Sequence, residues 1–349
     1  MGKNDKMTTK PKIFILYTGG TIGMVKDYNS NVLVPFDFDQ IQERIPELKQ
    51  LNCIIASESF ETPIDSSNMN VDYFREMVQI IEDHYEAFDG FVILTGSDTM
   101  SYTSSVVSFM IENLQKPIIF TGSQLPIGDL RTDAKENLIT AIQIASSQRN
   151  GIPMIREVGL YFEYKLYRAN RTTKINANNF EAFDSMNYPI LVESGVQLDF
   201  NTKFINIHSY NSDPPIFRKD LNTNIAILKL FPGITEPTIR AIIMNEHVEA
   251  VVLESFGSGN APTSEWFINV IKESILNGKI IVNVSQCIGG GVVQGKYDTS
   301  IRLKRIGVLS AGDMTTEAAV AKLMYLLTKN LSKKDFKKYF KKSLRGEIS

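Results

Sequence analysis

Three short apolar segments of the chain each end in a turn that is rich in glycine and hydroxyl side chains. Residues 13–17 lead into Thr18-Gly19-Gly20-Thr21, residues 91–94 into Thr95-Gly96-Ser97-Asp98, and residues 117–120 into Thr121-Gly122-Ser123. Apolar runs of about four to eight residues between turn signals are typical of buried strands of a parallel sheet. Ligands of open α/β sheets bind beyond the carboxyl ends of such strands. The pattern predicts an α/β fold with a small-molecule site, and favours an enzyme with a hydroxyl nucleophile.

Apolar residues at helical spacing follow these strands, which indicates parallel βαβ units. Helices are predicted over residues 71–88, 100–114 and 133–147. The pattern dissolves between residues 178 and 224, apart from a possible short strand at 205–207. A second α/β segment then begins, with strands over 225–231, 250–253 and 280–284, and helices over 235–244, 264–276, 315–327 and 333–342.

The length of 349 residues exceeds what one hydrophobic core usually organises, so two domains are expected. We predict a larger N-terminal domain over residues 1–195, with a doubly wound, mainly parallel sheet that carries the catalytic residues. Residues 196–224 form the predicted interdomain connection. Residues 225–349 form a smaller C-terminal α/β domain.

Charge and metal-ligand patterns exclude several classes of function. The formal net charge is −2, which gives no reason to expect nucleic acid or a membrane surface as a partner. Cys53 and Cys287 cannot form a disulfide framework and lack metal-ligand spacing. The histidines, His84, His208 and His247, form no paired-ligand pattern. We therefore expect no metal.

Targeting signals are absent from the sequence pattern. The first residues are polar and lysine-rich, and the apolar run that follows is too short for the core of a signal peptide. No stretch approaches the ~20 apolar residues of a membrane-spanning helix. We expect a cytoplasmic protein.

Thr21 is the first candidate nucleophile, because glycines at a strand end free backbone amides to face an anion or oxyanion. The spacing fits neither a dinucleotide-binding turn nor a P-loop. A threonine hydroxyl needs a positioned base, and Ser97, Asp98 and a buried lysine are candidates for activating it. A threonine that merely caps a helix or forms the turn is the alternative reading.

Several motifs resemble those of one enzyme family. Tyr17-Thr18-Gly19-Gly20-Thr21-Ile22-Gly23-Met24 is similar to the first signature of the bacterial L-asparaginases, and Leu94-Thr95-Gly96-Ser97-Asp98-Thr99-Met100 to the second. Further matching segments are residues 65–69, 117–124, 166–174, 257–262 and 344–347. The resemblance spans nearly the whole chain, keeps the order of the motifs, and is strongest to the cytoplasmic type I enzymes.

The resemblance implies hydrolysis of L-asparagine to L-aspartate and ammonia without a cofactor. Thr21 matches the threonine that attacks the side-chain amide and forms an acyl-enzyme. Ser97, Asp98 and Lys174 match a second catalytic group that handles protons. The residues that match substrate-binding positions are Asp65, Ser66, Ser67, Ser97, Asp98 and Asn260. Asn260 matches a residue offered by a neighbouring subunit, so a homodimer or homotetramer is expected.

The chain departs from the family pattern at three places. Thr95-Gly96-Ser97-Asp98 stands where the family usually has His-Gly-Thr-Asp, and serine lacks the methyl group that restricts χ1. The lid tyrosine of many members aligns near Leu33, with Tyr28 as the nearby substitute. Thr173 and Cys287 fit the allosteric site of some type I enzymes, but Glu254 replaces the expected arginine. An acidic side chain should repel a substrate carboxylate, so allostery is expected to be weak or absent.

Two alternatives remain open. One is an amidase of different specificity, or the asparaginase-like subunit of a tRNA-dependent amidotransferase. The other is a non-catalytic amino-acid sensor on the same fold, against which the intact Thr21, Asp98 and Lys174 weigh. The preference for asparagine over glutamine rests on one methylene, worth about 1–3 kcal/mol, and is not readable from the sequence.

Overall fold

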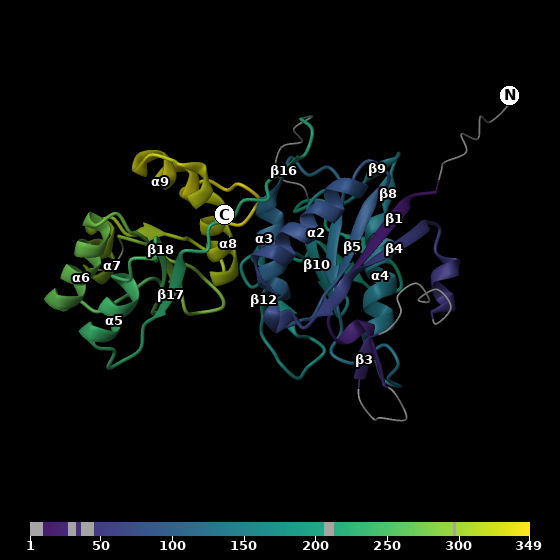
Figure 1. The fold of residues 1–349 in the computed structure, drawn as a ribbon, viewed down its shortest axis with the longest axis horizontal. Coiled ribbons are helices and arrows are strands. Elements are labelled where there is room, and N and C mark those ends of the chain that lie inside the picture. The colour runs from purple at the N-terminus through teal and green to yellow at the C-terminus, as the bar shows by residue number, and fades with distance from the viewer. Residues whose placement is uncertain (1–9, 27–32, 36–44, 206–212, 296–297) are drawn as a thin grey trace.

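The computed structural model of the chain describes residues 10–26, 33–35, 45–205, 213–295 and 298–349. Figure 1 shows two lobes side by side, an N-terminal lobe around a large sheet and a C-terminal lobe around a smaller one. Within the described residues, the large sheet has eight strands in the order β15-β14-β11-β10-β7-β5-β1-β4. The smaller sheet has four, in the order β17-β18-β19-β20. The predicted fold class is confirmed.

The centre of the large sheet is parallel. Its parallel strands are β1 (Lys12–Gly19), β4 (Ile54–Ile64), β5 (Gly90–Leu94), β7 (Ile118–Thr121) and β10 (Val158–Phe162). The antiparallel strands at the other edge are β11 (Lys165–Arg168), β14 (Val192–Ser194) and β15 (Leu198–Phe200). Every residue of β5 is buried, since this strand lies inside the sheet and helices cover both faces.

Alternate residues of β1 point to the two faces of the sheet, as the two-residue period of a strand requires. Phe14 and Leu16 pack on one face with α2 (Val71–His84) and α3 (Met100–Met110). Ile13 and Ile15 pack on the other face with α4 (Ala134–Ser146). The sheet is therefore wound on both sides.

The starts of two helices follow from their capping residues. Asn70 Oδ1 accepts a hydrogen bond of 2.9 Å from the Asp72 amide at the start of α2. Thr132 Oγ1 accepts one of 3.0 Å from the Ala134 amide at the start of α4. Each bond satisfies one of the amides that a helix leaves unpaired at its first turn.

The helix predicted over 100–114 ends earlier, at Met110. Ile111–Glu112 form a short strand, β6, that pairs with β16 (Ile216–Phe217). The helical spacing of apolar residues continues past Met110 in the sequence. The chain nevertheless leaves the helix there, because residues 111–112 pair with a strand about a hundred positions away. Likewise, the helix predicted over 71–88 ends at His84.

The C-terminal sheet is parallel and consists of β17 (Ile225–Lys229), β18 (Ala250–Ser255), β19 (Ile280–Ser285) and β20 (Leu309–Ser310). One face packs against α5 (Glu236–Ile243), α6 (Glu265–Leu276) and α7 (Asp298–Ile306) through Ile239, Phe267 and Leu303. The other face packs against α8 (Thr316–Leu326). A final helix, α9 (Lys333–Lys341), buries Phe336 and Phe340.

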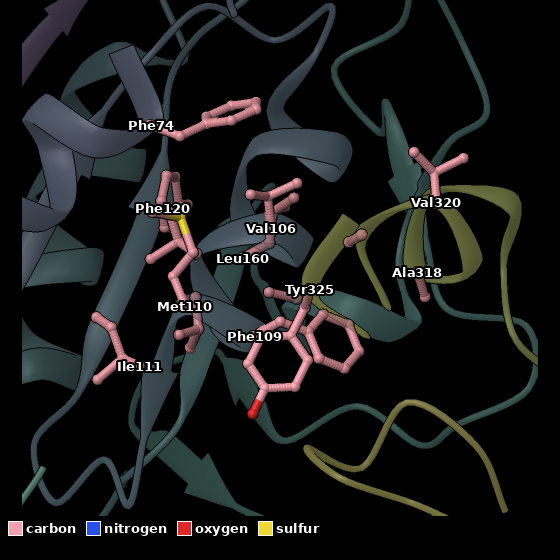
Figure 2. Close-up of a cluster of buried hydrophobic side chains, with 14 of the residues drawn as sticks. Phe74, Val106, Phe109, Met110, Ile111, Phe120, Leu160, Ala318, Val320 and Tyr325 are labelled. Carbon is pink, nitrogen blue, oxygen red and sulfur yellow. The ribbon is translucent and has the colours of Figure 1, made fainter. Parts of the chain in front are cut away.

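Helix α8 also packs against α3, so a single hydrophobic cluster joins the two lobes. Figure 2 shows Phe109 of α3 beside Tyr325 of α8, and their ring centroids lie 6.0 Å apart. β15 belongs to the large sheet and lies beyond residue 195, where the sequence analysis placed the first boundary. In the part of the chain that the structure describes, no helix is both long and apolar enough to span a bilayer.

Shorter ladders complete the fold. They are β2 (Met24–Lys26) with β3 (Leu33–Pro35), β8 (Gln148–Arg149) with β9 (Ile152–Pro153), and β12 (Thr173–Lys174) with β13 (Phe183–Asp184). A short strand was considered at residues 205–207. Ile205 lies in a turn, and residues 206 and 207 lie outside the described part of the chain.

Candidate active site

Three turns approach one another closely at the carboxyl edge of the large sheet. β1 runs parallel to both β4 and β5, so the three strands end on the same side. A Cβ atom on Gly20 would lie 2.4 Å from the amide nitrogen of Gly96, and one on Gly96 would lie 2.5 Å from Ser66 Oγ. Both distances are shorter than any real Cβ contact. The glycines are therefore required for the turns to approach one another.

Thr21 lies in the first of these turns. It begins a 3₁₀ turn (Thr21–Gly23) directly after Gly20, whose φ of +88° favours glycine. Tyr17 stabilises this turn, since its hydroxyl donates a hydrogen bond of 3.2 Å to the Gly20 carbonyl. Burial raises the pKa of Tyr17 to about 12, so the phenol keeps its proton and remains a donor at neutral pH. Thr21 itself is half-buried.

Lys174 brings an amino group to the turn that follows β5. Its Nζ donates hydrogen bonds of 2.9 Å to Ser97 Oγ and 2.6 Å to Asp98 Oδ1. The lysine reaches this position from β12, far from the turn in the sequence. A neutral lysine can accept the proton of a hydroxyl, and a carboxylate beside it fixes its orientation. The structure thus brings together the three residues of the predicted second catalytic group.

Asp65, Ser66 and Ser67 follow β4 at the same edge. Asp65 Oδ1 accepts hydrogen bonds from the Ser67 hydroxyl (2.7 Å) and the Ser67 amide (2.9 Å). These bonds lower the pKa of the Asp65 carboxyl below its usual value, so it is charged at neutral pH. Ser66 is buried, whereas Asp65 and Ser67 are exposed. The Thr99 hydroxyl donates to the Ser66 carbonyl at 2.8 Å and joins this turn to the turn of β5.

Asn260 belongs to the other lobe, in the loop between β18 and α6. Its backbone pairs with Phe256 in both directions, at 2.8 and 2.9 Å. Asn283, fully buried on β19, donates a hydrogen bond of 3.1 Å to the Gly259 carbonyl and accepts one of 2.5 Å from Ser255 Oγ. The loop that carries Asn260 is therefore fixed to the C-terminal sheet.

Glu254, the residue at the predicted departure from the allosteric pattern, is engaged within its own lobe. Its Oε1 accepts a hydrogen bond of 2.6 Å from the Thr316 hydroxyl, and Lys229 Nζ lies 3.6 Å from Oε2. Cys287 is exposed. Tyr28 and His208 lie outside the described residues, and for Leu33 the structure describes the backbone alone.

Two groups around the site were missed in the sequence. Tyr17 was quoted as part of a motif without a role, although its place two residues before the glycines was a usable signal. Glu317 accepts a hydrogen bond of 2.6 Å from the hydroxyl of Thr173, the residue before Lys174. No sequence signal links positions so far apart. Among the described residues, no three His, Cys, Asp or Glu side chains converge as metal ligands.

Comparison with known families covers most of the chain. Residues 12–206 match the model of the N-terminal asparaginase domain, and residues 224–340 match that of the glutaminase/asparaginase C-terminal domain. The chain belongs to the asparaginase family. The two motifs that resemble the family's signatures occupy the turns that follow β1 and β5.

Individual relatives support this asparaginase membership. The chain is 37% identical to L-asparaginase 1 of Escherichia coli K12 over 348 residues, which cover 97% of this chain and 98% of that protein. The crystal structure of L-asparaginase I from Vibrio cholerae is similar with a TM-score of 0.89 and 37% identity, covering 98% of this chain and all of that one. The mouse 60 kDa lysophospholipase is 35% identical over 98% of this chain and 63% of its own length.

Proposed function

We propose that this chain hydrolyses L-asparagine to L-aspartate and ammonia, with Thr21 as the nucleophile. The observation that carries the proposal is the contact of Lys174 Nζ with Ser97 Oγ and Asp98 Oδ1, in a chain similar over its full length to L-asparaginases. A hydroxyl, an amine and a carboxylate in contact form a proton-transfer group. The Thr21 turn lies on the same edge of the sheet.

In the first step, Thr21 Oγ attacks the carbon of the side-chain amide and loses its proton. The C–N bond then breaks, and the departing nitrogen takes up a proton as ammonia leaves. The product is an ester between Thr21 and the aspartyl group. Amides of the glycine turns are suited to stabilise the oxyanion of the tetrahedral intermediate, a contribution commonly worth about 2.7–4 kcal/mol per donor.

In the second step, water attacks the ester carbon and Thr21 leaves with a proton. Ser97, Asp98 and Lys174 are proposed to take the proton from the water or the nucleophile and return it to the leaving group. Lys174 already donates to both partners, so the group is connected before substrate binds.

Substrate recognition is proposed to use the charges at the same edge. Asp98, with a side chain 69% exposed, is available to the α-ammonium group. Asp65, Ser66 and Ser67 supply a charged carboxylate and two hydroxyls for the zwitterion, and Ser97 lies in the neighbouring turn, where Gly96 approaches Ser66. Because the acidic Glu254 should repel a second substrate carboxylate and is engaged with Thr316, we propose that regulation by L-asparagine is weak or absent.

Asn260 is proposed to reach the site of a neighbouring subunit, so that the active form is a homodimer or homotetramer. We also propose a cytoplasmic location and no cofactor. We propose two domains, the first extended beyond the predicted 1–195 to include β15, and the second over residues 225–349. Light scattering of the purified protein tests the assembly. A monomer with full activity would contradict the role given to Asn260.

The deciding experiment is ammonia release from L-asparagine and L-glutamine over a concentration series, for the unsubstituted chain and for Thr21→Val. Thr62→Val, at an exposed position of β4, is the matched control. We expect Thr21→Val to lose turnover by several orders of magnitude and Thr62→Val to keep it. An amino-acid sensor would show binding without turnover in every variant, and a different amidase would leave both amides intact. A sigmoidal curve would contradict the absence of regulation.

A further inference from the structure

Lys174 is carried by a very short strand. β12 consists of Thr173 and Lys174, and it pairs with two residues of β13. A two-stranded ladder is at best marginally stable by itself. The position of Lys174 Nζ against Ser97 and Asp98 must therefore depend on further contacts of the segment that leads into β12.

Those contacts come from the C-terminal lobe. Thr173 Oγ1 donates a hydrogen bond of 2.6 Å to Glu317 Oε1, at the first turn of α8. Two residues earlier, Arg171 donates 2.9 Å bonds to Asp313 Oδ2 and to the Glu347 carbonyl. The lobe that lacks Thr21 and Ser97 thus contacts the lysine segment twice within three positions.

Glu317 is itself firmly placed. Glu317 is buried, with 8% of its surface exposed. It lies in the first turn of α8, where the N-cap residue Thr315 accepts a hydrogen bond of 3.1 Å from the Ala318 amide. The partial positive charge of the helix N-terminus favours a carboxylate at this turn. Burial raises the pKa of Glu317, while the bond from Thr173 opposes that rise. Helix α8 packs on α3, the helix that directly follows Ser97 and Asp98 (Figure 2).

We infer that Glu317 is a positioning residue, whose hydrogen bond to Thr173 ties the Lys174 strand to the C-terminal lobe and holds Lys174 Nζ against Ser97 and Asp98. The inference rests on the catalytic role proposed for Lys174. Helix α8 then contacts the two elements next to the proton-transfer group: α3, which follows Ser97 and Asp98, and β12, which carries Lys174. A misplacement of about 1 Å at a catalytic group costs on the order of 10²-fold in rate.

The test compares Glu317→Ala, which removes the acceptor, with Glu317→Gln, which keeps one. Thr316→Val is the matched control, because it removes a hydrogen bond of the same 2.6 Å length from the same helix turn, but one made within the C-terminal lobe. We expect kcat for L-asparagine to fall on the order of 10²-fold in Glu317→Ala with little change in KM. Glu317→Gln should restore most of kcat, and Thr316→Val should keep it.

Hydrogen exchange of the Ile175 amide, which donates to the Ala182 carbonyl at 2.8 Å, gives a readout that needs no activity. Exchange should accelerate in Glu317→Ala and not in Thr316→Val. Equal kcat and equal exchange in the two variants would overturn the inference. If the unsubstituted chain does not hydrolyse L-asparagine, the proposed function fails, and the exchange comparison still decides whether Glu317 holds the strand.

If Glu317→Ala does not fold, the same bond can be removed from its other end. Thr173→Val lacks the hydroxyl donor and Thr173→Ser keeps it. A low kcat and fast exchange in Thr173→Val, with both normal in Thr173→Ser, support the inference. Normal behaviour of Thr173→Val contradicts it.

Discussion

Lys174 Nζ lies 2.6 Å from Asp98 Oδ1, although 76 positions separate the two residues in the chain. The two partners differ in exposure, with 18% of the lysine side chain accessible and 69% of the aspartate side chain. An ion pair with one exposed partner contributes only about 0–1 kcal/mol to folding. The contact therefore matters for where it places the amine, beside the Ser97 hydroxyl, more than for stability.

Lys174→Met should remove activity without removing the fold. The thioether keeps the length of the aliphatic stem but cannot accept or donate the proton, so kcat should fall about 10²–10⁴-fold. Ammonia release and thermal unfolding measure the two effects. Lys165→Met, which breaks an ion pair with Glu181 in the segment before β13, is the control and should retain activity. Full turnover in Lys174→Met would remove the lysine from the mechanism.

Gly96→Ala should damage the site through one methyl group. That carbon would lie 2.5 Å from Ser66 Oγ and 2.7 Å from Ser66 Cβ, so one of the two turns has to move. We expect kcat/KM for L-asparagine to fall on the order of 10²-fold. Gly195→Ala adds the same methyl where the nearest atom is 3.8 Å away, and should leave kcat/KM unchanged. Similar kinetics in both variants would show that the close approach is not needed.

Lys322→Met should destabilise the protein strongly. Lys322 and Glu347 form an ion pair in which both side chains are fully buried. Burial lowers the pKa of Lys322; it also opposes ionisation of Glu347, but the lysine and two backbone amides hold the pKa of that carboxyl low. Removing the lysine leaves a buried charge without its partner, a loss of about 3–5 kcal/mol in the free energy of unfolding.

Urea denaturation measures this loss. Lys322→Met combined with Glu347→Gln should recover part of it, because no uncompensated charge then remains. The control is Lys135→Met, which breaks a half-exposed pair with Glu47 and should cost at most about 1 kcal/mol. Equal losses for the two lysines would contradict the account.

Glu163 should make the protein less stable as the pH rises. Burial and the nearby carboxylates of Asp133, Glu136 and Glu181 raise the pKa of Glu163 to about 7, from an ordinary value of 4.5. The folded state then holds a proton that the unfolded state has released, so this contribution is fully present below about pH 4.5 and lost as the pH passes about 7.

Urea unfolding between these two pH values tests the sign. Glu163→Gln cannot ionise, so the decline in the free energy of unfolding should become shallower. Glu193→Gln, at an exposed position of β14, should keep the original slope. A steeper decline in Glu163→Gln would show that the sign is wrong.

The sequence predicted the strands and helices whose signals are local. Uninterrupted apolar runs marked β1, β5, β7, β18 and β19, because strands buried on both faces need no polar alternation. The sequence analysis did not predict β4, β10 and β11. The end of α3 was also wrong, since the pairing of Ile111–Glu112 with Ile216–Phe217 involves residues distant in the chain.

The catalytic candidates were found because each lies in a recognisable motif. Thr21, Ser97 and Asp98 follow apolar strands, and Lys174 was identified through the family resemblance. Glu317 and Tyr17 were missed for a different reason. Neither was a candidate for chemistry, and each contributes by holding another residue in place.

By itself, the sequence determined that strands would end in glycine turns bearing hydroxyls and a carboxylate, because strand burial and glycine's backbone freedom are local properties. The tertiary structure decided which of these groups meet. It placed Lys174 against Ser97 and Asp98 and brought Glu317 of the second lobe to Thr173. Contacts of this kind depend on how sheets and helices pack over the whole chain, and no local pattern encodes the distance between two side chains so far apart in sequence.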